Sequence, residues 1–243
     1  MRKMINISLS FDGEEFMKCG YMWLNPYAPN TGRRFVFSDI ESRKNLAKYI
    51  HNEKVNIDVA VLNKWNEFVF FIQFQILVLD YGLENQSENE WWVYGTVCDI
   101  DTLEYSQGKM NSFNLWQREE VFEWFNTTNA PLKVDYISAC FLYSGLSKKI
   151  LEKYVYQFDM SLVKEEKDFF YLSSLEFVGD RGYFGHDFYT WEDCLLELYH
   201  HNGYFYDKKI VFLNTDKIYN EEIEKLFEEV KKTFLKYKFE IEM

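Results

Sequence analysis

The fold of the C-terminal part of this chain depends on one stretch, Gly182-Tyr-Phe-Gly185 followed by His186-Asp-Phe-Tyr-Thr-Trp-Glu-Asp-Cys-Leu195. Gly185 predicts a backbone turn with positive φ, and Asp187 suits the N-cap of a helix. Apolar residues then recur at helical spacing and predict a core-facing stripe up to about His201: Phe188, Trp191, Leu195 and Leu198. The outer face of this helix carries Tyr189, Glu192, Asp193, Leu196 and His200.

Strand and helix patterns alternate on both sides of this stretch. Short apolar runs predict strands, and 3.6-residue spacing predicts helices. Their order is strand 153–159, helix 164–177, helix 187–201, strand 208–213, helix 221–235 and strand 237–242. Strands separated by helices favour parallel pairing with right-handed crossovers. The sequence therefore predicts an α/β domain with a small parallel sheet over residues 150–243.

The first part of the chain has a different pattern. Runs of β-prone residues predict strands over 6–11, 34–37, 58–62, 67–79, 91–100 and 133–143. Helical spacing predicts helices over 39–51 and 115–125, the second with Val121, Trp124 and Phe125 facing inward. These elements predict a mixed α+β domain over residues 1–145. The polar segment Ser144-Gly-Leu-Ser-Lys-Lys149 is the predicted boundary.

The net charge of the chain limits the kinds of macromolecule that it can bind. The net charge is −12, so the chain repels phosphate backbones and attracts basic proteins. Residues 151–243 contain 20 acidic and 12 basic residues and therefore carry most of this charge. Nucleic acid is not an expected partner. The alternative is that the acidic residues only keep the surface soluble.

The cysteines and the hydropathy of the sequence indicate the cellular compartment of the protein. The four cysteines lie far apart and form no Cys-x-x-Cys pair, which favours reduced thiols. No signal peptide is predicted at the N-terminus. The most apolar run, residues 68–79, is too short to span a bilayer. We therefore expect a cytoplasmic protein that does not associate with membranes.

Two strings carry a resemblance to a known family. Gly182-Tyr-Phe-Gly185 precedes Trp191-Glu-Asp-Cys-Leu195, and Glu166-Lys-Asp-Phe-Phe170 begins the helix upstream. In these residues and in the order of its elements, the segment 153–243 resembles the barstar family, the intracellular inhibitors of barnase-type ribonucleases. The resemblance does not extend to the first part of the chain. It implies a three-stranded parallel sheet covered by helices.

The resemblance also implies a helix and a loop that plug a ribonuclease active site. The family's central acid falls on Asp193, its loop aromatic on Tyr183, and an acid of its last helix on Glu221. A ribonuclease site built from Lys, Arg and His suits carboxylates, because they form charge-assisted hydrogen bonds and steer association. Gly185, Tyr189 and Glu192 complete the predicted partner-binding set.

Two positions depart from the family pattern. Tyr189 stands where a second acid usually precedes Asp193 by four residues, and Glu192 replaces an aromatic residue. Neighbouring helix residues diverge by about 100°, so Glu192 compensates only in part for the missing acid. We therefore expect a cognate target other than a barnase-like enzyme, or a different activity on a shared scaffold.

The predicted site residues also have simpler explanations. Asp193 suits a solvated helix position, and Tyr183 suits a core. Gly185 meets a demand of the backbone. Glu221 complements the dipole at a helix N-terminus.

Three classes of function remain. The first is a protein inhibitor of the immunity or antitoxin type, without catalytic activity, that binds a basic ribonuclease or related toxin. The second is a two-domain adaptor. The third is a hydrolase with paired carboxylates, which is disfavoured because Gly-x-Ser-x-Gly, His-Glu-x-x-His and Walker motifs are absent. His200 and His201 diverge on their helix, so no metal or cofactor is predicted.

Overall fold

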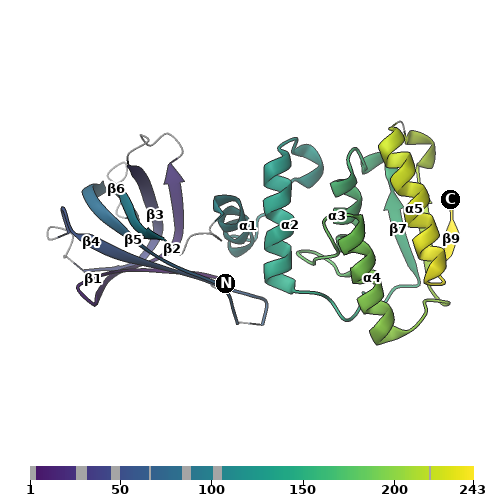
Figure 1. The fold of residues 1–243 in the computed structure, drawn as a ribbon, viewed down its shortest axis with the longest axis horizontal. Helices are drawn as coiled ribbons and strands as arrows, with labels where there is room; N and C mark the ends of the chain where they lie inside the picture. The colour runs from purple at the N-terminus through teal and green to yellow at the C-terminus, as the bar shows by residue number, and fades with distance from the viewer. Residues whose placement is uncertain are drawn as a thin grey trace. The chain divides into compact units, whose positions relative to one another are not determined.

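The computed structural model describes residues 4–25, 32–44, 50–65, 67–83, 89–100, 106–218 and 220–243. Two compact units divide the chain, Met1–Phe122 and Glu123–Met243 (Figure 1). Strands and helices are present in both units, in agreement with the predicted α+β and α/β domains. Within the described residues, no helix is both long enough and apolar enough to cross a membrane.

The first unit is built around a closed antiparallel barrel with the strand order β1-β2-β3-β6-β5-β4. Its strands are β1 Ile5–Phe11, β2 Glu14–Asn25, β3 Arg33–Arg43, β4 Lys54–Leu62, β5 Phe68–Leu83 and β6 Glu90–Ile100. Buried residues alternate along β1 and β4, as expected for strands with one face towards a core. Helix α1, Gln107–Gln117, is tied to β1 because Gln117 Oε1 accepts from the Met4 and Ile5 amides at 2.9 and 3.1 Å.

Two predictions for this unit are wrong in detail. Residues Asp39–Arg43 continue β3 and do not begin a helix; residues 45–49 of the predicted helix lie outside the described part. The second predicted helix, 115–125, begins earlier and ends at Gln117, and Val121 is 78% exposed. The Ser106 hydroxyl accepts from the Lys109 amide and sets the start of α1, while Glu119 has φ +60° beyond its end.

The second unit contains a parallel sheet of three strands, as predicted, and the strand order is β7-β8-β9. The strands are β7 Val155–Asp159, β8 Lys209–Leu213 and β9 Glu240–Glu242. Helices α3 Glu166–Phe177, α4 Phe188–Asn202 and α5 Glu221–Lys236 gather beside this sheet (Figure 1). Alternate residues of β7 and β8 are buried, including Phe158 and Phe212, so the aromatic core lies on one face of the sheet. Trp191 of α4 completes this core by packing on Phe169 and Phe234.

The predicted strand over 133–143 is instead helix α2, Ala130–Ser144. Its aromatic and β-branched residues favour a strand by propensity, but Asn129 caps the helix by accepting from the Leu132 amide. Five of the six buried positions follow one helical stripe, and the sixth is Ala139. The stripe consists of Lys133, Tyr136, Ile137, Cys140 and Ser144. Burial by tertiary packing therefore decides the structure of this segment.

Helix α2 belongs to the second unit, so the chain divides before it and not at the predicted segment 144–149. A buried ion pair ties α2 to α3, because Lys133 Nζ lies 2.8 Å from Asp168 Oδ1. Asp168 also accepts from Trp124 Nε1 at 2.8 Å and from the Lys164 and Glu165 amides. Burial lowers the pKa of Lys133, but its hydrogen bonds to Asp168 and Glu165 outweigh burial and raise that pKa overall.

Candidate functional site

The glycine turn and the start of α4 form one rigid structure. Gly185 has φ +88°, and a Cβ atom placed there would lie 2.5 Å from the backbone N and Cα of Trp191. Asp187 is the N-cap, as predicted. Its Oδ1 accepts from the Thr190 amide at 2.8 Å, and Thr190 Oγ1 accepts from the Asp187 amide at 3.2 Å. The reciprocal bonds fix the direction in which α4 leaves the turn.

Replacement of Asp187 by alanine is expected to lower the free energy of unfolding by about 1 kcal/mol, as for other N-caps. Partial burial raises the pKa of the Asp187 carboxyl, but hydrogen bonds from Thr190 outweigh burial and hold that pKa below its usual 3.8. A lowered folded-state pKa means that the stabilisation is present above pH 3.8 and is lost as pH falls through the folded value. Urea unfolding of both proteins at neutral and acidic pH checks this. A difference that does not shrink in acid would contradict it.

Tyr183 points into the protein. Its side chain is 7% exposed, its ring packs against Phe141 at a centroid distance of 4.8 Å, and its hydroxyl lies 2.9 Å from His186 Nδ1. Burial raises the pKa of Tyr183 to about 12. The side chain of Tyr183 therefore lies in the core, and it adds little to the exposed surface.

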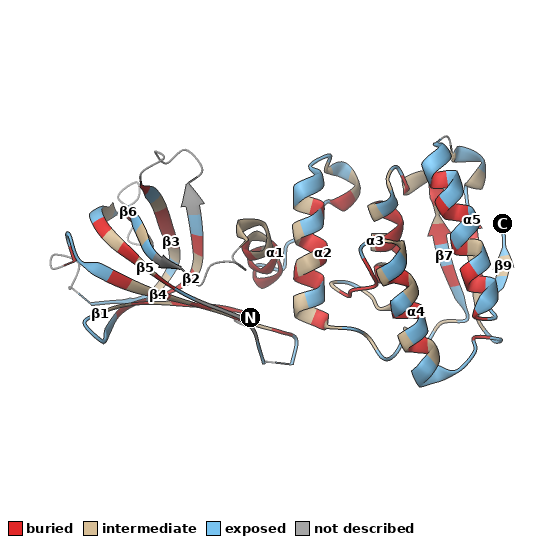
Figure 2. Ribbon diagram, viewed as in Figure 1, coloured by how far each residue is buried: buried red, intermediate tan, exposed pale blue. Residues whose placement is uncertain are grey.

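The exposed face of α4 carries Tyr189, Asp193 and Leu196, which are spaced at i, i+4 and i+7 on one side of the helix. Exposed and buried segments alternate along α4 in Figure 2. Tyr189 is 79% exposed. Asp193 is exposed and forms no ion pair or hydrogen bond with the residues that the structure describes. Its carboxylate is therefore open to an external donor.

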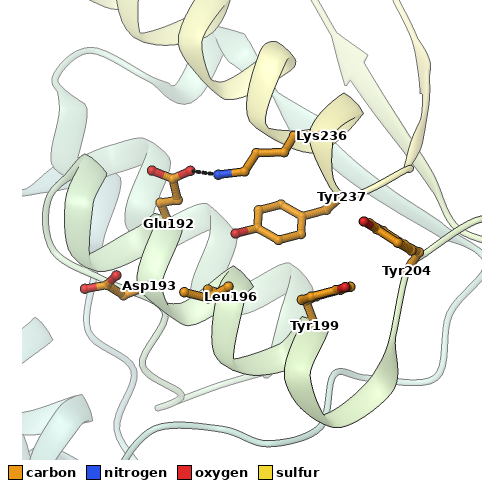
Figure 3. A pocket seen from close by; sticks show the side chains of 7 residues that line it. All are labelled: Glu192, Asp193, Leu196, Tyr199, Tyr204, Lys236 and Tyr237. Carbon is orange, nitrogen blue, oxygen red and sulfur yellow. Dashed lines mark hydrogen bonds and ion pairs between the residues drawn. The ribbon is translucent and has the colours of Figure 1, made fainter.

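A hollow of about 330 Å³ adjoins this face (Figure 3). It is lined by Glu192, Asp193, Leu196, Tyr199, Tyr204, Lys236 and Tyr237. Glu192 Oε1 lies 2.7 Å from Lys236 Nζ, so α5 supplies a cation to the acid of α4. The Tyr199 ring lies 4.8 Å from that of Tyr204 and 5.8 Å from that of Tyr237. Carboxylates thus occur beside a wall of tyrosine rings.

Glu221 lies elsewhere. It is the first residue of α5, it is exposed, and it lines a second hollow with Glu224, Lys225, Glu228, Glu229 and Lys232. The structure therefore brings Glu192 and Asp193 together, and does not bring Glu221 into the same hollow. Three acids occupy the first turn of α5, where they complement the helix dipole.

No family model, curated protein or solved structure matches this chain.

The side chains of the hollow suit a cationic group. Carboxylates accept charge-assisted hydrogen bonds, and tyrosine faces attract ammonium and guanidinium groups. Among the described residues, no group of three His, Cys, Asp or Glu side chains could hold a metal ion. The arrangement can therefore bind a basic group by charge and by ring stacking.

Sequence reasoning did not single out Lys236, Tyr199, Tyr204 or Tyr237. The one available signal was the density of tyrosine between 199 and 206, where Tyr206 is also exposed. Lys236 and Tyr237 lie at the end of α5, about thirty residues beyond that run. Their place in the hollow depends on the packing of α5 beside α4, which helical spacing alone does not reveal.

Proposed function

We propose that residues 123–243 form an inhibitor module that binds a basic ribonuclease or a related toxin through the exposed face of α4. The observation that carries this proposal is Asp193, an exposed carboxylate without an internal partner among the described residues, beside tyrosine rings. Tyrosine is enriched at protein interfaces, and a single charged side chain that becomes desolvated there can act as a hot spot. The resemblance to the barstar family supports the same surface.

The charge of the chain supports a basic target. A net charge of −12 draws a cationic protein towards the surface and speeds encounter. A ribonuclease active site concentrates cationic side chains for phosphate, so a carboxylate can occupy the position of a phosphate oxygen. Inhibition then follows from occupation of the active site, and the module itself needs no catalytic group.

The proposed surface contains a different exposed aromatic residue from the one that the resemblance implies. Tyr183 is buried, so the exposed ring nearest the start of α4 is that of Tyr189. We propose that Tyr189 and Asp193 contact the target, and that Gly185 acts through the backbone by positioning α4. Glu221 contributes to the negative field around the module. These roles favour a target that differs from barnase-like enzymes.

A pull-down from the producing cells, with mass spectrometry and an inhibition assay, tests the proposal. The expected result is a small basic partner that forms a one-to-one complex and loses ribonuclease or toxin activity as the complex forms. A panel of purified basic ribonucleases provides the parallel assay. If neither approach gives a complex or protection, the proposed function fails.

The second candidate is an adaptor in which each unit binds its own partner. It is favoured by the separate barrel, whose exposed Trp65 and Phe68 lie around the turn between β4 and β5. Separate expression of residues 1–122 and 123–243 distinguishes the candidates. Full protection by the second fragment alone would remove the reason for an adaptor. A fragment that begins at residue 150 is unsuitable because it lacks Lys133, the partner of Asp168.

A further inference from the structure

The hollow beside Asp193 already contains a cationic side chain. The Lys236 ammonium lies 2.7 Å from Glu192 Oε1 and 5.3 Å from the centre of the Tyr237 ring. Figure 3 shows the Lys236 side chain extending to Glu192 alongside the Tyr237 ring. Its position combines a carboxylate with an aromatic face, which is the environment that basic side chains prefer at interfaces.

Lys236 is held there only weakly. Its side chain is 62% exposed, and exposed ion pairs stabilise proteins little because water screens them and the side chains lose rotamer freedom. By contrast, Tyr237 is only 3% exposed, so its ring is a fixed part of the hollow. Movement of Lys236 would therefore leave Glu192 and the Tyr237 ring available to another cation at small cost.

We propose that this hollow is a subsite for an arginine side chain of the partner, which displaces Lys236 from Glu192. The partner's guanidinium binds the Glu192 carboxylate and stacks against the tyrosine wall of Tyr199, Tyr204 and Tyr237. Lys236 is an internal substitute for this group and keeps the site occupied until the partner arrives. The inference rests on the proposed function for the basic character of the partner.

Arginine suits the subsite better than lysine. Its planar guanidinium can bind a carboxylate through two parallel hydrogen bonds and stack on a ring at the same time, and it is less strongly hydrated than an ammonium. A second lysine would only exchange one ammonium for another. The subsite therefore discriminates among basic partners, and it lies next to Asp193 on the same helix.

The test uses the full chain with 13C-labelled tyrosine rings and three blocked tripeptides, in which glycine flanks arginine, lysine or citrulline. Citrulline has nearly the shape of arginine without its charge. The arginine peptide is expected to shift the Tyr199, Tyr204 and Tyr237 signals at millimolar concentration. The lysine peptide should bind more weakly, and the citrulline peptide should leave the signals unchanged.

Two substitutions in α5 distinguish displacement of Lys236 from an effect of the net charge of the protein. Lys236→Gln frees Glu192 and should tighten arginine-peptide binding about fivefold, the scale of an exposed ion pair. Lys232→Gln changes the net charge equally, but Lys232 lies in the other hollow, so its effect should be much smaller. Glu192→Gln should abolish the shifts. Equal shifts with citrulline, equal effects of the two lysine variants, or the absence of any shift would overturn the inference.

This experiment contains no ribonuclease, so it fails independently of the proposed function. Loss of the arginine response with intact inhibition of a toxin would remove the subsite and leave the inhibitor module. An arginine response without any toxin complex would retain the subsite and remove the proposed function. Circular dichroism of each variant checks that the fold is unchanged.

Discussion

Replacement of Asp168 by alanine is expected to lower the free energy of unfolding of the second unit by about 3–5 kcal/mol, the usual result of breaking a buried ion pair. The carboxylate accepts from Lys133, from Trp124 Nε1 and from two backbone amides. Its removal leaves these donors buried without their acceptor, and Lys133 loses its buried counter-ion. Urea unfolding followed by far-ultraviolet circular dichroism measures the change.

Glu165→Gln is the matched control for Asp168→Ala. Glu165 also binds the Lys133 ammonium at 2.8 Å, but its side chain is partly exposed to solvent. Loss of its charge should therefore cost less than about 1 kcal/mol, as for exposed pairs. Equal losses for the two variants would show that burial of the Asp168 network does not determine its contribution.

Gly185→Ala is expected to lower the free energy of unfolding by about 2–5 kcal/mol. The new methyl group would lie 2.5 Å from the backbone N and Cα of Trp191, and these atoms cannot move without disturbing the start of α4. The left-handed backbone adds about 1–2 kcal/mol, and overpacking adds about 1–3 kcal/mol. Thermal unfolding and urea unfolding of the variant provide the measurement.

Gly203→Ala separates these two contributions. Gly203 also has positive φ, +76°, at the C-terminal end of α4, but a Cβ atom there would have no neighbour within 4 Å. Its backbone, with φ +76° and ψ −163°, lies in a region that essentially only glycine adopts, so its replacement should produce only backbone strain, of about 1–3 kcal/mol. If Gly203→Ala is as damaging as Gly185→Ala, close approach to Trp191 is not what requires glycine at 185.

The elements of the second unit that were predicted correctly are those in which residue propensity, capping residues and apolar spacing all indicate the same structure. In α5, apolar residues recur at helical spacing from Ile223 to Phe234, and all of the predicted core positions are buried. Asp187 caps α4 at the residue where the sequence places it. For α2, strand propensity and helical burial disagree, and contacts such as Lys133 with Asp168 favour the helix. The sequence around Lys133 does not show that partner, which lies on another helix.

The barrel was only partly predictable. The alternating residues of β1 and β4 indicate strands, but closure depends on pairing between β1 and β4, which are distant in the sequence. β2 escaped prediction because charged residues and Gly20 interrupt its pattern. Such pairings are decided by register across the sheet rather than by local preference.

The exposed residues of the site followed from helical geometry, whereas its buried and paired residues did not. Asp193 is exposed because Trp191 and Leu195 fix which face of α4 is buried. Tyr183 is buried because Phe141, far away in the sequence, packs against its ring. Glu192 is paired because α5 ends beside it and supplies Lys236. A single helix pattern contains none of this information.

The most direct test of the central claim is the affinity of the partner for the Asp193→Ala variant, measured by isothermal titration calorimetry with the purified basic partner. If the face of α4 is the binding surface, the variant should lose at least about 2 kcal/mol of binding free energy, the usual threshold for a hot spot, while its unfolding curve stays unchanged. An affinity equal to that of the unmodified protein would contradict the claim that this partner binds at Asp193.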